Sequence, residues 1–316
     1  MMEVVVASIG NETSAIRTFE LVSAGGGALP PFTAGAHIDV HLANGLVRQY
    51  SLCNHPLEQH RYVIGVLKDT ASRGGSVALH EAVAEGDVLN ISAPRNLFNL
   101  YSEARRSLLF AGGIGITPIL CMAEHLAQNG AAFELHYCAR SEDSAAFIGR
   151  LKASSFASQV VFHFDDDAGS RLDADQVLKN PAAGTHLYVC GPGGFMEHIL
   201  GSARANGWHE EQLHKEYFAA APVDAAGDGS FVMKIASTGQ ELTVSEGKSA
   251  VAVLHEHGFD IPISCEMGFC GTCLTRVIEG TPDHRDTYLT EAEQAANDQF
   301  LPCCSRAKTP FLVVDL

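Results

Sequence analysis

The sequence is poor in basic residues: 21 Lys and Arg stand against 37 Asp and Glu, giving a formal net charge of −16 over 316 residues. Proteins that bind nucleic acid need clustered Lys and Arg to neutralise phosphates, so this shortage argues against a nucleic-acid partner. An acidic chain of this kind is suited to docking on a basic protein surface.

The sequence also lacks long apolar runs. Even the stretch SLLFAGGIGITPIL is interrupted by glycine and proline, well short of the ~20 residues that a membrane-spanning helix needs. The N-terminal stretch MMEVVVASIGNE has neither the basic nor the apolar segment of a signal peptide. We therefore expect no membrane segment and a cytoplasmic location.

A secreted disulfide framework is excluded, because the nine cysteines are odd in number and unevenly spread. Four of them lie in apolar strand or helix patterns and are expected to be small buried hydrophobes: Cys53, Cys121, Cys138 and Cys190. The other five gather near the C-terminus, and three of these fall in SCEMGFCGTCLTR at residues 264–276.

Cys265, Cys270 and Cys273 follow the spacing C-x4-C-x2-C, which with a distant fourth cysteine is the plant-type [2Fe–2S] pattern. Structural zinc usually takes two closely spaced ligand pairs, and here no paired histidine accompanies the downstream cysteines. A redox C-x2-C opens a helix, whereas this one leads into a predicted strand. We therefore favour a [2Fe–2S] cluster over zinc. The spacing alone leaves Cys303 and Cys304 both open as the fourth ligand.

The chain divides into three segments of different periodicity. Residues 1–103 contain short alternating strands such as HIDVHL and RYVIGVLKD, which are typical of an antiparallel β-barrel. Residues 104–222 alternate strands, glycine turns and helices, which predicts a parallel sheet flanked by helices. After the linker-like AAAPVDAAGDG, residues 223–316 predict a small sheet that grasps one helix.

Two short motifs in the first segment could bind a flavin. In RQYSL, Arg48 can pair with a phosphate, Tyr50 can stack on a planar ring, and Ser51 can hydrogen-bond to the edge of that ring. In SRGGS, a glycine turn that includes Gly75 and Ser76 can offer N–H groups to a phosphate. Both motifs are common in strands and loops, so neither identifies a ligand by itself.

Two glycine turns in the second segment could bind a dinucleotide. AGGIGITP, which includes Gly113 and Gly115, follows a buried strand and opens a helix that we expect to have Thr117 at its N-cap. The amides of such a turn suit a pyrophosphate, although close packing explains it equally well. VCGPGGFM, with Cys190 and Gly191, repeats the geometry at a second strand end.

Taken in order, RQYSLCN, RGGS, AGGIGITP, CGPGGFM and SCEMGFCGTC through CCSRAK resemble the phthalate dioxygenase reductase family over essentially the whole chain. The resemblance implies a multidomain fold: an FMN-binding antiparallel β-barrel (1–103), an NAD-binding α/β parallel-sheet domain (104–222) and an α+β β-grasp ferredoxin domain (223–316). It also implies an electron-transfer partner, a Rieske-type terminal oxygenase.

Residue roles also follow from the resemblance. Arg48 would bind the FMN phosphate, Tyr50 would flank the flavin, and Ser51 would lie near its N5 atom. Thr117 and Cys190 would position the nicotinamide. The remaining flavin contacts would be Ile64, Gly65, Val66, Gly75 and Ser76, and the four iron ligands would be Cys265, Cys270, Cys273 and Cys303, with Cys304 a bystander.

The nucleotide is expected to be NADH, which the family uses. In ARSEDSAAF, Arg140 could suit a 2′-phosphate and Glu142 or Asp143 a 2′-hydroxyl. One departure from the family concerns Lys215, which occupies a position where some relatives carry an aromatic residue against the flavin. Tyr217 and Phe218 are therefore alternative candidates to shield it.

The resulting hypothesis is an NADH-dependent reductase that passes electrons from NADH through FMN and [2Fe–2S] to an oxygenase. Two alternatives are an FAD-containing electron-transfer subunit of a dehydrogenase and a non-enzymatic redox carrier or sensor. The sequence is compatible with a monomer, and it does not name the aromatic substrate, which the oxygenase selects.

Overall fold

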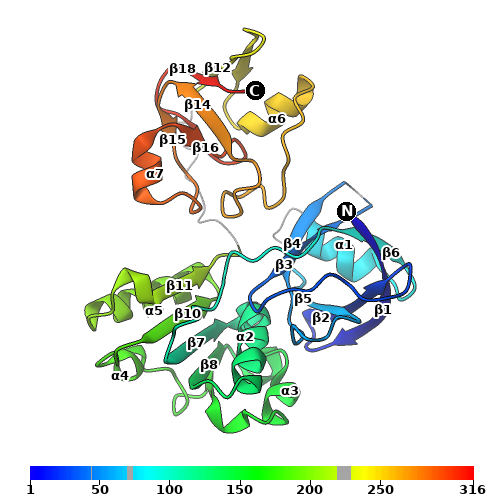
Figure 1. The fold of residues 1–316 in the computed structure, drawn as a ribbon, viewed down its shortest axis with the longest axis vertical. Coiled ribbons are helices and arrows are strands. Elements are labelled where there is room, and N and C mark those ends of the chain that lie inside the picture. Colours follow the sequence, from blue (N-terminus) through cyan, green and yellow to red (C-terminus); the bar gives the residue numbers. More distant parts are fainter. Residues whose placement is uncertain (44, 70–73, 219–228) are drawn as a thin grey trace. The chain divides into compact units, whose positions relative to one another are not determined.

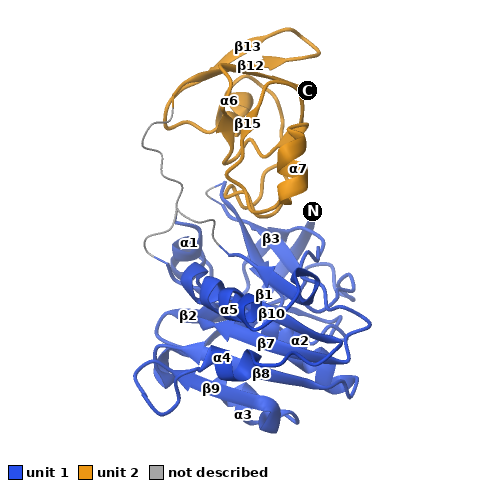
Figure 2. Ribbon diagram, turned by 90° about the vertical axis from the view of Figure 1, so that its left-hand side faces the viewer, with its two compact units in different colours: residues 1–218 blue, residues 219–316 orange. Residues whose placement is uncertain are grey.

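The computed structural model describes residues 1–43, 45–69, 74–218 and 229–316. These form two compact units, Met1–Phe218 and Ala219–Leu316 (Figure 2). Asn44 of the predicted hairpin turn, the first two residues of SRGGS and most of the predicted linker lie outside the described residues. Within the described part of the chain, no helix is long and apolar enough to cross a membrane.

The first sheet of unit 1 has six antiparallel strands in the order β4-β3-β6-β1-β2-β5 (Figure 1). Its strands are β1 (Met2–Asn11), β2 (Ile16–Ser23), β3 (His37–His41), β4 (Val47–Ser51), β5 (Tyr62–Leu67) and β6 (Val88–Ile91). A bridge between Leu52 and Ile64 joins the two outer strands, so the sheet closes into a barrel. The helix α1 (Gly75–Ala82) stands where the sequence predicted only a glycine turn.

The second sheet of unit 1 is parallel, in the order β11-β10-β7-β8-β9. Its strands are β7 (Arg106–Gly112), β8 (Phe133–Ala139), β9 (Val160–Phe164), β10 (Thr185–Cys190) and β11 (Leu213–Glu216). Its α-helices are α2 (Ile116–Gln128), α3 (Ile148–Lys152), α4 (Ala174–Leu178) and α5 (Gly193–Ala205). Strands β8 and β10 flank β7 on opposite sides, and in such sheets ligands bind where the strand order reverses.

One detail of α2 differs from the prediction. The helix begins at Ile116 with Gly115 as its N-cap, so Thr117 lies in the first turn rather than at the cap. The Thr117 hydroxyl donates to the carbonyl of Ile114 at 3.0 Å.

The barrel and the parallel sheet share one hydrophobic core. The largest cluster of buried side chains runs from barrel residues such as Phe19 and Ile64 to Ile119 and Leu120 of α2. Figure 1 shows α2 between the two sheets. Because the barrel and the parallel sheet share this core, they form one compact unit, Met1–Phe218. The domain boundary predicted at residue 103, inside that unit, stays a prediction.

Unit 2 is a mixed sheet in the order β13-β12-β18-β14-β16, with a separate ladder between β15 and β17. The strands are β12 (Phe231–Ile235), β13 (Glu241–Val244), β14 (Thr275–Glu279), β15 (Pro282–Asp283), β16 (Gln299–Phe300), β17 (Arg306–Ala307) and β18 (Phe311–Val314). The helices are α6 (Ala250–Glu256) and α7 (Glu291–Ala296). The predicted capping box of α7 is present, since the Thr290 hydroxyl accepts from the Glu293 N–H and the Glu293 carboxylate accepts from the Thr290 N–H.

Candidate functional site

Two predicted site residues, Ser51 and Cys190, meet a third residue that the sequence did not single out, Glu216, where the barrel joins the carboxyl edge of the parallel sheet. Cys190 ends β10 and Glu216 ends the neighbouring strand β11, directly beside it. Ser51 ends barrel strand β4, and its hydroxyl donates to Glu216 Oε2 at 3.3 Å. The chain thus brings together residues 165 positions apart.

Burial sets the protonation of this group. It raises the pKa of Glu216 to about 8, with the hydrogen bond from Ser51 opposing it, so the carboxyl holds a proton at neutral pH. Burial, helped by Glu216, also raises the pKa of the Cys190 thiol well above its ordinary value. Cys190 is therefore a neutral thiol, which can shape a binding site but does not act as a nucleophile.

The two predicted glycine turns lie in contact with each other. A Cβ added to Gly115 would stand 2.2 Å from the Cys190 carbonyl oxygen, and one added to Gly191 would stand 2.9 Å from the Gly112 Cα. By contrast, a Cβ on Gly113, Gly193 or Gly194 would meet nothing within 4 Å. Packing therefore explains Gly115 and Gly191, while the open positions leave room for a pyrophosphate beside the start of α5.

The barrel and α2 approach each other at Gly65. A Cβ added to this residue of β5 would lie 2.8 Å from Thr117 Cγ2. The side chains on both sides of Gly65 in the strand, Ile64 and Val66, are fully buried. Gly65, proposed for the flavin, and Thr117, proposed for the nicotinamide, are thus neighbours.

Arg48 and Gly75 are also neighbours, although they are far apart in the chain. A Cβ on Gly75 would lie 2.5 Å from Arg48 Cγ, so only glycine lets the start of α1 pack on the arginine stem. Tyr50, two residues after Arg48, is half-buried, and burial raises the pKa of its phenol. Ser76, in the first turn of α1, accepts the Asp69 N–H at 3.0 Å. The guanidinium and the first turn of α1 together suit a phosphate.

The predicted ribose-reading residues lie apart from this group. Arg140 is exposed just beyond β8, and Glu142 pairs with Lys152 at 2.5 Å. The segment after β9 runs alongside, because the Asp166 N–H donates to the Arg140 carbonyl at 3.1 Å. That segment carries three consecutive carboxylates, Asp165–Asp167.

In unit 2 the predicted iron ligands face one another. Hydrogen bonds with Cys270 and Cys303 lower the pKa of the Cys265 thiol, and the Cys303 thiol likewise lowers that of Cys273. The Met267 N–H donates to Cys265 Sγ at 3.4 Å. A cluster of two irons on four thiolates fits these contacts.

Two glycines shape the cysteine loop, and both have left-handed φ angles. At Gly268 (φ 79°), a Cβ would lie 2.4 Å from Cys304 Sγ, and at Gly271 (φ 70°) it would lie 2.3 Å from the Tyr288 ring. The Thr287 N–H also donates to the Gly268 carbonyl at 3.0 Å. Thr287 and Tyr288 therefore brace the loop from outside. Just before them, Arg285 and Asp283 form a salt-bridged turn, with Arg285 Nη2 2.8 Å from Asp283 Oδ2.

The contacts also separate Cys303 from Cys304. Cys303 contacts both Cys265 and Cys273, whereas Cys304 packs on Gly268, with Leu301 O and Ser305 Oγ as its hydrogen-bond neighbours. This arrangement supports Cys303 as the fourth ligand.

Sequence reasoning missed Glu216 and singled out the residue before it. Lys215 is exposed, and its Nζ lies 5.6 Å from the centre of the Tyr217 ring, on the opposite face of β11 from Glu216. Phe218 packs against the large shared core, whereas Tyr217 packs with the core on the α5 face of the sheet. Glu216 could have been proposed from its place at the end of a strand that runs parallel to the strand of Cys190, since the ends of such neighbouring strands lie side by side.

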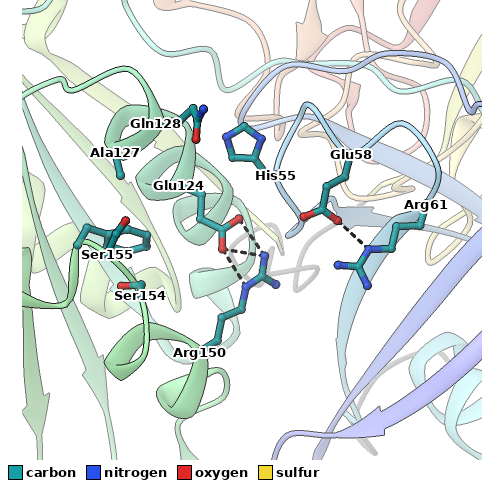
Figure 3. Close-up of a pocket in the computed structure, with 10 residues that line it drawn as sticks. His55, Glu58, Arg61, Glu124, Ala127, Gln128, Arg150, Ser154 and Ser155 are labelled. Atoms are coloured by element: carbon teal, nitrogen blue, oxygen red, sulfur yellow. Dashed lines mark hydrogen bonds and ion pairs between the residues drawn. The ribbon is translucent and has the colours of Figure 1, made fainter.

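A cavity of about 650 Å³ opens elsewhere in unit 1, between the loop before β5 and the far end of α2 (Figure 3). Its walls carry two ion pairs: Arg150 bonds both carboxylate oxygens of Glu124 at 2.8 and 2.9 Å, and Arg61 bonds Glu58 at 2.7 Å. None of the predicted site residues lines it. The nearest lining residue on α2, Glu124, lies about 10 Å along the helix from Thr117, at 1.5 Å per residue, so the cavity is separate from the predicted cofactor site.

Comparison with known proteins agrees with both units. Residues 233–308 match the 2Fe-2S iron-sulfur cluster binding domain, and residues 92–213 match the N-terminal domain of dimethylamine monooxygenase subunit DmmA-like proteins. A vanillate O-demethylase oxidoreductase of Pseudomonas putida is 62% identical over 317 residues, covering all of both chains. A phthalate 4,5-dioxygenase reductase subunit of the same species is 42% identical, covering 94% of this chain and 91% of its own.

Among solved structures, phthalate dioxygenase reductase matches with a TM-score of 0.81 and 36% identity, over 100% of this chain and 98% of its own. The chain belongs to the phthalate dioxygenase reductase family. The reductase is thus an oxidoreductase that binds a flavin, NADH and a [2Fe–2S] cluster and serves an oxygenase. The predicted combination of flavin barrel, nucleotide-binding parallel sheet and ferredoxin fold is confirmed, and zinc is excluded as the main alternative for the cysteine loop.

Proposed function

We propose that this reductase serves a Rieske-type oxygenase that removes a methyl group from vanillate or a close aromatic analogue. Three relatives named vanillate O-demethylase oxidoreductase are 52–62% identical to it over essentially the full length. A relative serving phthalate 4,5-dioxygenase is 42% identical, and one serving a tert-butanol monooxygenase is 45% identical. The higher sequence identity to the vanillate reductases than to the phthalate and tert-butanol reductases supports vanillate as the substrate of the partner oxygenase.

The observation that carries the electron route is the meeting of Ser51, Cys190, Glu216, Gly65 and Thr117 at one junction of barrel and parallel sheet. A flavin held here would supply the conversion of a two-electron hydride transfer from the nicotinamide into single-electron transfers to the cluster. Hydride transfer needs the two rings stacked with reacting atoms about 3–3.5 Å apart. The chain's task at this junction is therefore positioning.

The proposed roles of individual residues follow from their contacts. Arg48 and the first turn of α1 hold the FMN phosphate, while Tyr50, Ile64 and Val66 border the flavin ring. Ser51 presents its hydroxyl to the ring edge while bonded to Glu216, whose carboxyl holds a proton at neutral pH. Cys190 and Thr117 border the nicotinamide, and the turns at Gly113 and Gly191 take the pyrophosphate.

The proposed nucleotide preference is NADH rather than NADPH. The carboxylates of Asp165–Asp167 follow a strand whose end lies beside Arg140, and they would repel a 2′-phosphate there. The preference is measured as the ratio of kcat/KM for NADH to that for NADPH, which we expect to exceed one by a large factor.

The proposal is tested by reconstitution. The purified reductase is mixed with a vanillate oxygenase component or with a phthalate dioxygenase component, and formaldehyde release or dihydrodiol formation is followed with NADH. We expect efficient turnover with the vanillate component alone. Turnover with only the phthalate component would overturn the substrate assignment but not the reductase function. A monomeric state and a cytoplasmic location complete the proposal.

A further inference from the structure

Phe147 has a backbone conformation that a bulky side chain rarely adopts. It is the N-cap of α3, with φ 62° and ψ 13° in the left-handed region. Glycine and asparagine are the usual occupants of this region. Such strain persists only where surrounding contacts enforce it, and it concentrates at functional sites.

Two contacts from the barrel hold Phe147 in place. Its N–H donates to Oε2 of Glu12, which directly follows β1, at 2.9 Å. Its ring, in a residue only 3% exposed, packs against β5, since a Cβ on Gly65 would lie 3.3 Å from Phe147 Cζ. The strained residue is thus fixed to the barrel through both its backbone and its ring.

The ring contact falls on the point where the barrel approaches α2. The Cβ that would touch Phe147 would lie 2.8 Å from Thr117 Cγ2. Gly65, Thr117 and Phe147 therefore form one three-way contact among β5, α2 and the start of α3. No sequence motif singled out Phe147, which closes the ARSEDSAAF stretch considered for the ribose.

We propose that Phe147 is a positioning residue for hydride transfer, because its ring fixes the spacing between β5 and the first turn of α2. This inference rests on the proposed function, in which β5 borders the flavin and Thr117 borders the nicotinamide. In the transfer, the C4–H bond of NADH breaks with both electrons, the N5–H bond of the flavin forms, and NAD⁺ leaves. Phe147 acts through Gly65 and Thr117, and a misplacement of about 1 Å can slow such a step by roughly 100-fold.

A purely structural role would show up differently. Phe156 offers the matched control: it is also a buried phenylalanine of this half of unit 1, 6% exposed, and it packs edge-on against Phe133 at 5.7 Å. Phe147→Leu and Phe156→Leu remove a comparable amount of ring packing. Only the first change alters the contact with Gly65.

The experiment is anaerobic stopped-flow bleaching of the flavin by NADH in the full-length, flavin-loaded protein. For Phe147→Leu we expect normal flavin content and a dissociation constant for NADH within about threefold of wild type. The limiting rate of flavin bleaching should fall to about one tenth of the wild-type rate or below. Phe147→Tyr, which keeps the ring, should restore the rate, and Phe156→Leu should react at the wild-type rate. The charge-transfer absorbance of the NADH–flavin complex should weaken only in Phe147→Leu.

Three results would overturn the inference: a wild-type limiting rate in folded Phe147→Leu, an equal loss in Phe156→Leu, or a loss confined to NADH affinity. Bleaching of the wild-type protein is scored separately, because its failure would refute the proposed function itself. A second variant guards against misfolding. In Gly65→Ala the added Cβ would stand 2.8 Å from Thr117 Cγ2 and 3.3 Å from Phe147 Cζ, so this change disturbs the same contact. The double variant Gly65→Ala/Phe147→Leu should therefore lose less than the product of the two single losses, whereas multiplied losses would contradict the shared contact.

Discussion

At the scale of single residues, reduction of the flavin and reduction of the cluster depend on different side chains and can be separated by mutation. Cys273→Ser removes one of the four proposed thiolates, so we expect loss of the [2Fe–2S] absorbance and of NADH-dependent reduction of cytochrome c. Bleaching of the flavin by NADH should remain, because its proposed site lies in unit 1. Cys138→Ser, which changes a cysteine outside the loop, should keep the cluster. Loss of flavin bleaching in a folded, flavin-loaded Cys273→Ser protein would contradict the separation.

Arg48 is tested by flavin occupancy. A charge-assisted hydrogen bond is worth about 1.5–3 kcal/mol, so Arg48→Ala should weaken FMN binding by roughly 10- to 100-fold. The control is Arg61→Ala, another barrel arginine, which bonds Glu20 and Glu58 and is expected to leave FMN binding unchanged. Binding is measured by flavin fluorescence on titration into the apoprotein, and stoichiometric, tight FMN in Arg48→Ala would refute the phosphate role.

Glu216 predicts a pH dependence of stability. Its pKa in the folded chain is about 8, above the ordinary 4.5, so the folded state keeps a proton that the unfolded state releases. Stability from this group is therefore complete below about pH 4.5 and declines as the pH rises towards 8. Glu216→Gln cannot titrate, so its Tm relative to wild type should rise steadily from pH 5 to pH 8. Parallel Tm profiles for the two proteins would show that the carboxyl is not buried as described.

At the scale of elements, the cysteine loop depends on glycine for two separable reasons. Gly271 and Gly239 both have left-handed φ, 70° and 72°, but only at Gly271 would a Cβ strike a neighbour, the Tyr288 ring. Alanine at either position costs about 1 kcal/mol through its backbone conformation. We expect Gly239→Ala to lower stability by that amount and keep its cluster, and Gly271→Ala to lose cluster content as well. Iron and sulfide analysis decides this, and equal cluster content in both variants would argue against the bracing role of Tyr288.

Strands and helices with clear periodicity could be predicted from the sequence, and contacts between elements could not. The alternation in HIDVHL and the apolar stretch SLLFA predict the strands β3 and β7, because a strand's periodicity can be read from sequence. The burial of the polar His37 and Asp39 in β3 could not be read from that alternation. Helix α1 was missed because two glycines open it, and a glycine turn and a glycine-led helix look alike in sequence. Its position against Arg48 depends on tertiary packing.

The candidate site shows the same division. Ser51, Thr117, Cys190 and the ligand cysteines stand in motifs, so sequence could propose them. Glu216 and Phe147 stand in no motif, and their importance lies in contacts with residues 165 and 135 positions away. Only the folded chain brings those partners together.

At the scale of the whole molecule, the chain combines a unit proposed to take two electrons from a nucleotide with a unit that releases them singly. The two units have separate hydrophobic cores, and the residues that join them lie outside the described structure. Each unit therefore carries its own part of the chemistry, and the function requires electrons to pass from one to the other.

The most direct measurement of that claim is an anaerobic titration of the purified reductase with NADH, followed by absorbance and low-temperature EPR. We expect NADH to bleach the flavin and also to produce the rhombic signal of a reduced [2Fe–2S] cluster. A cluster signal that appears with dithionite but never with NADH would contradict the route from nucleotide through flavin to cluster.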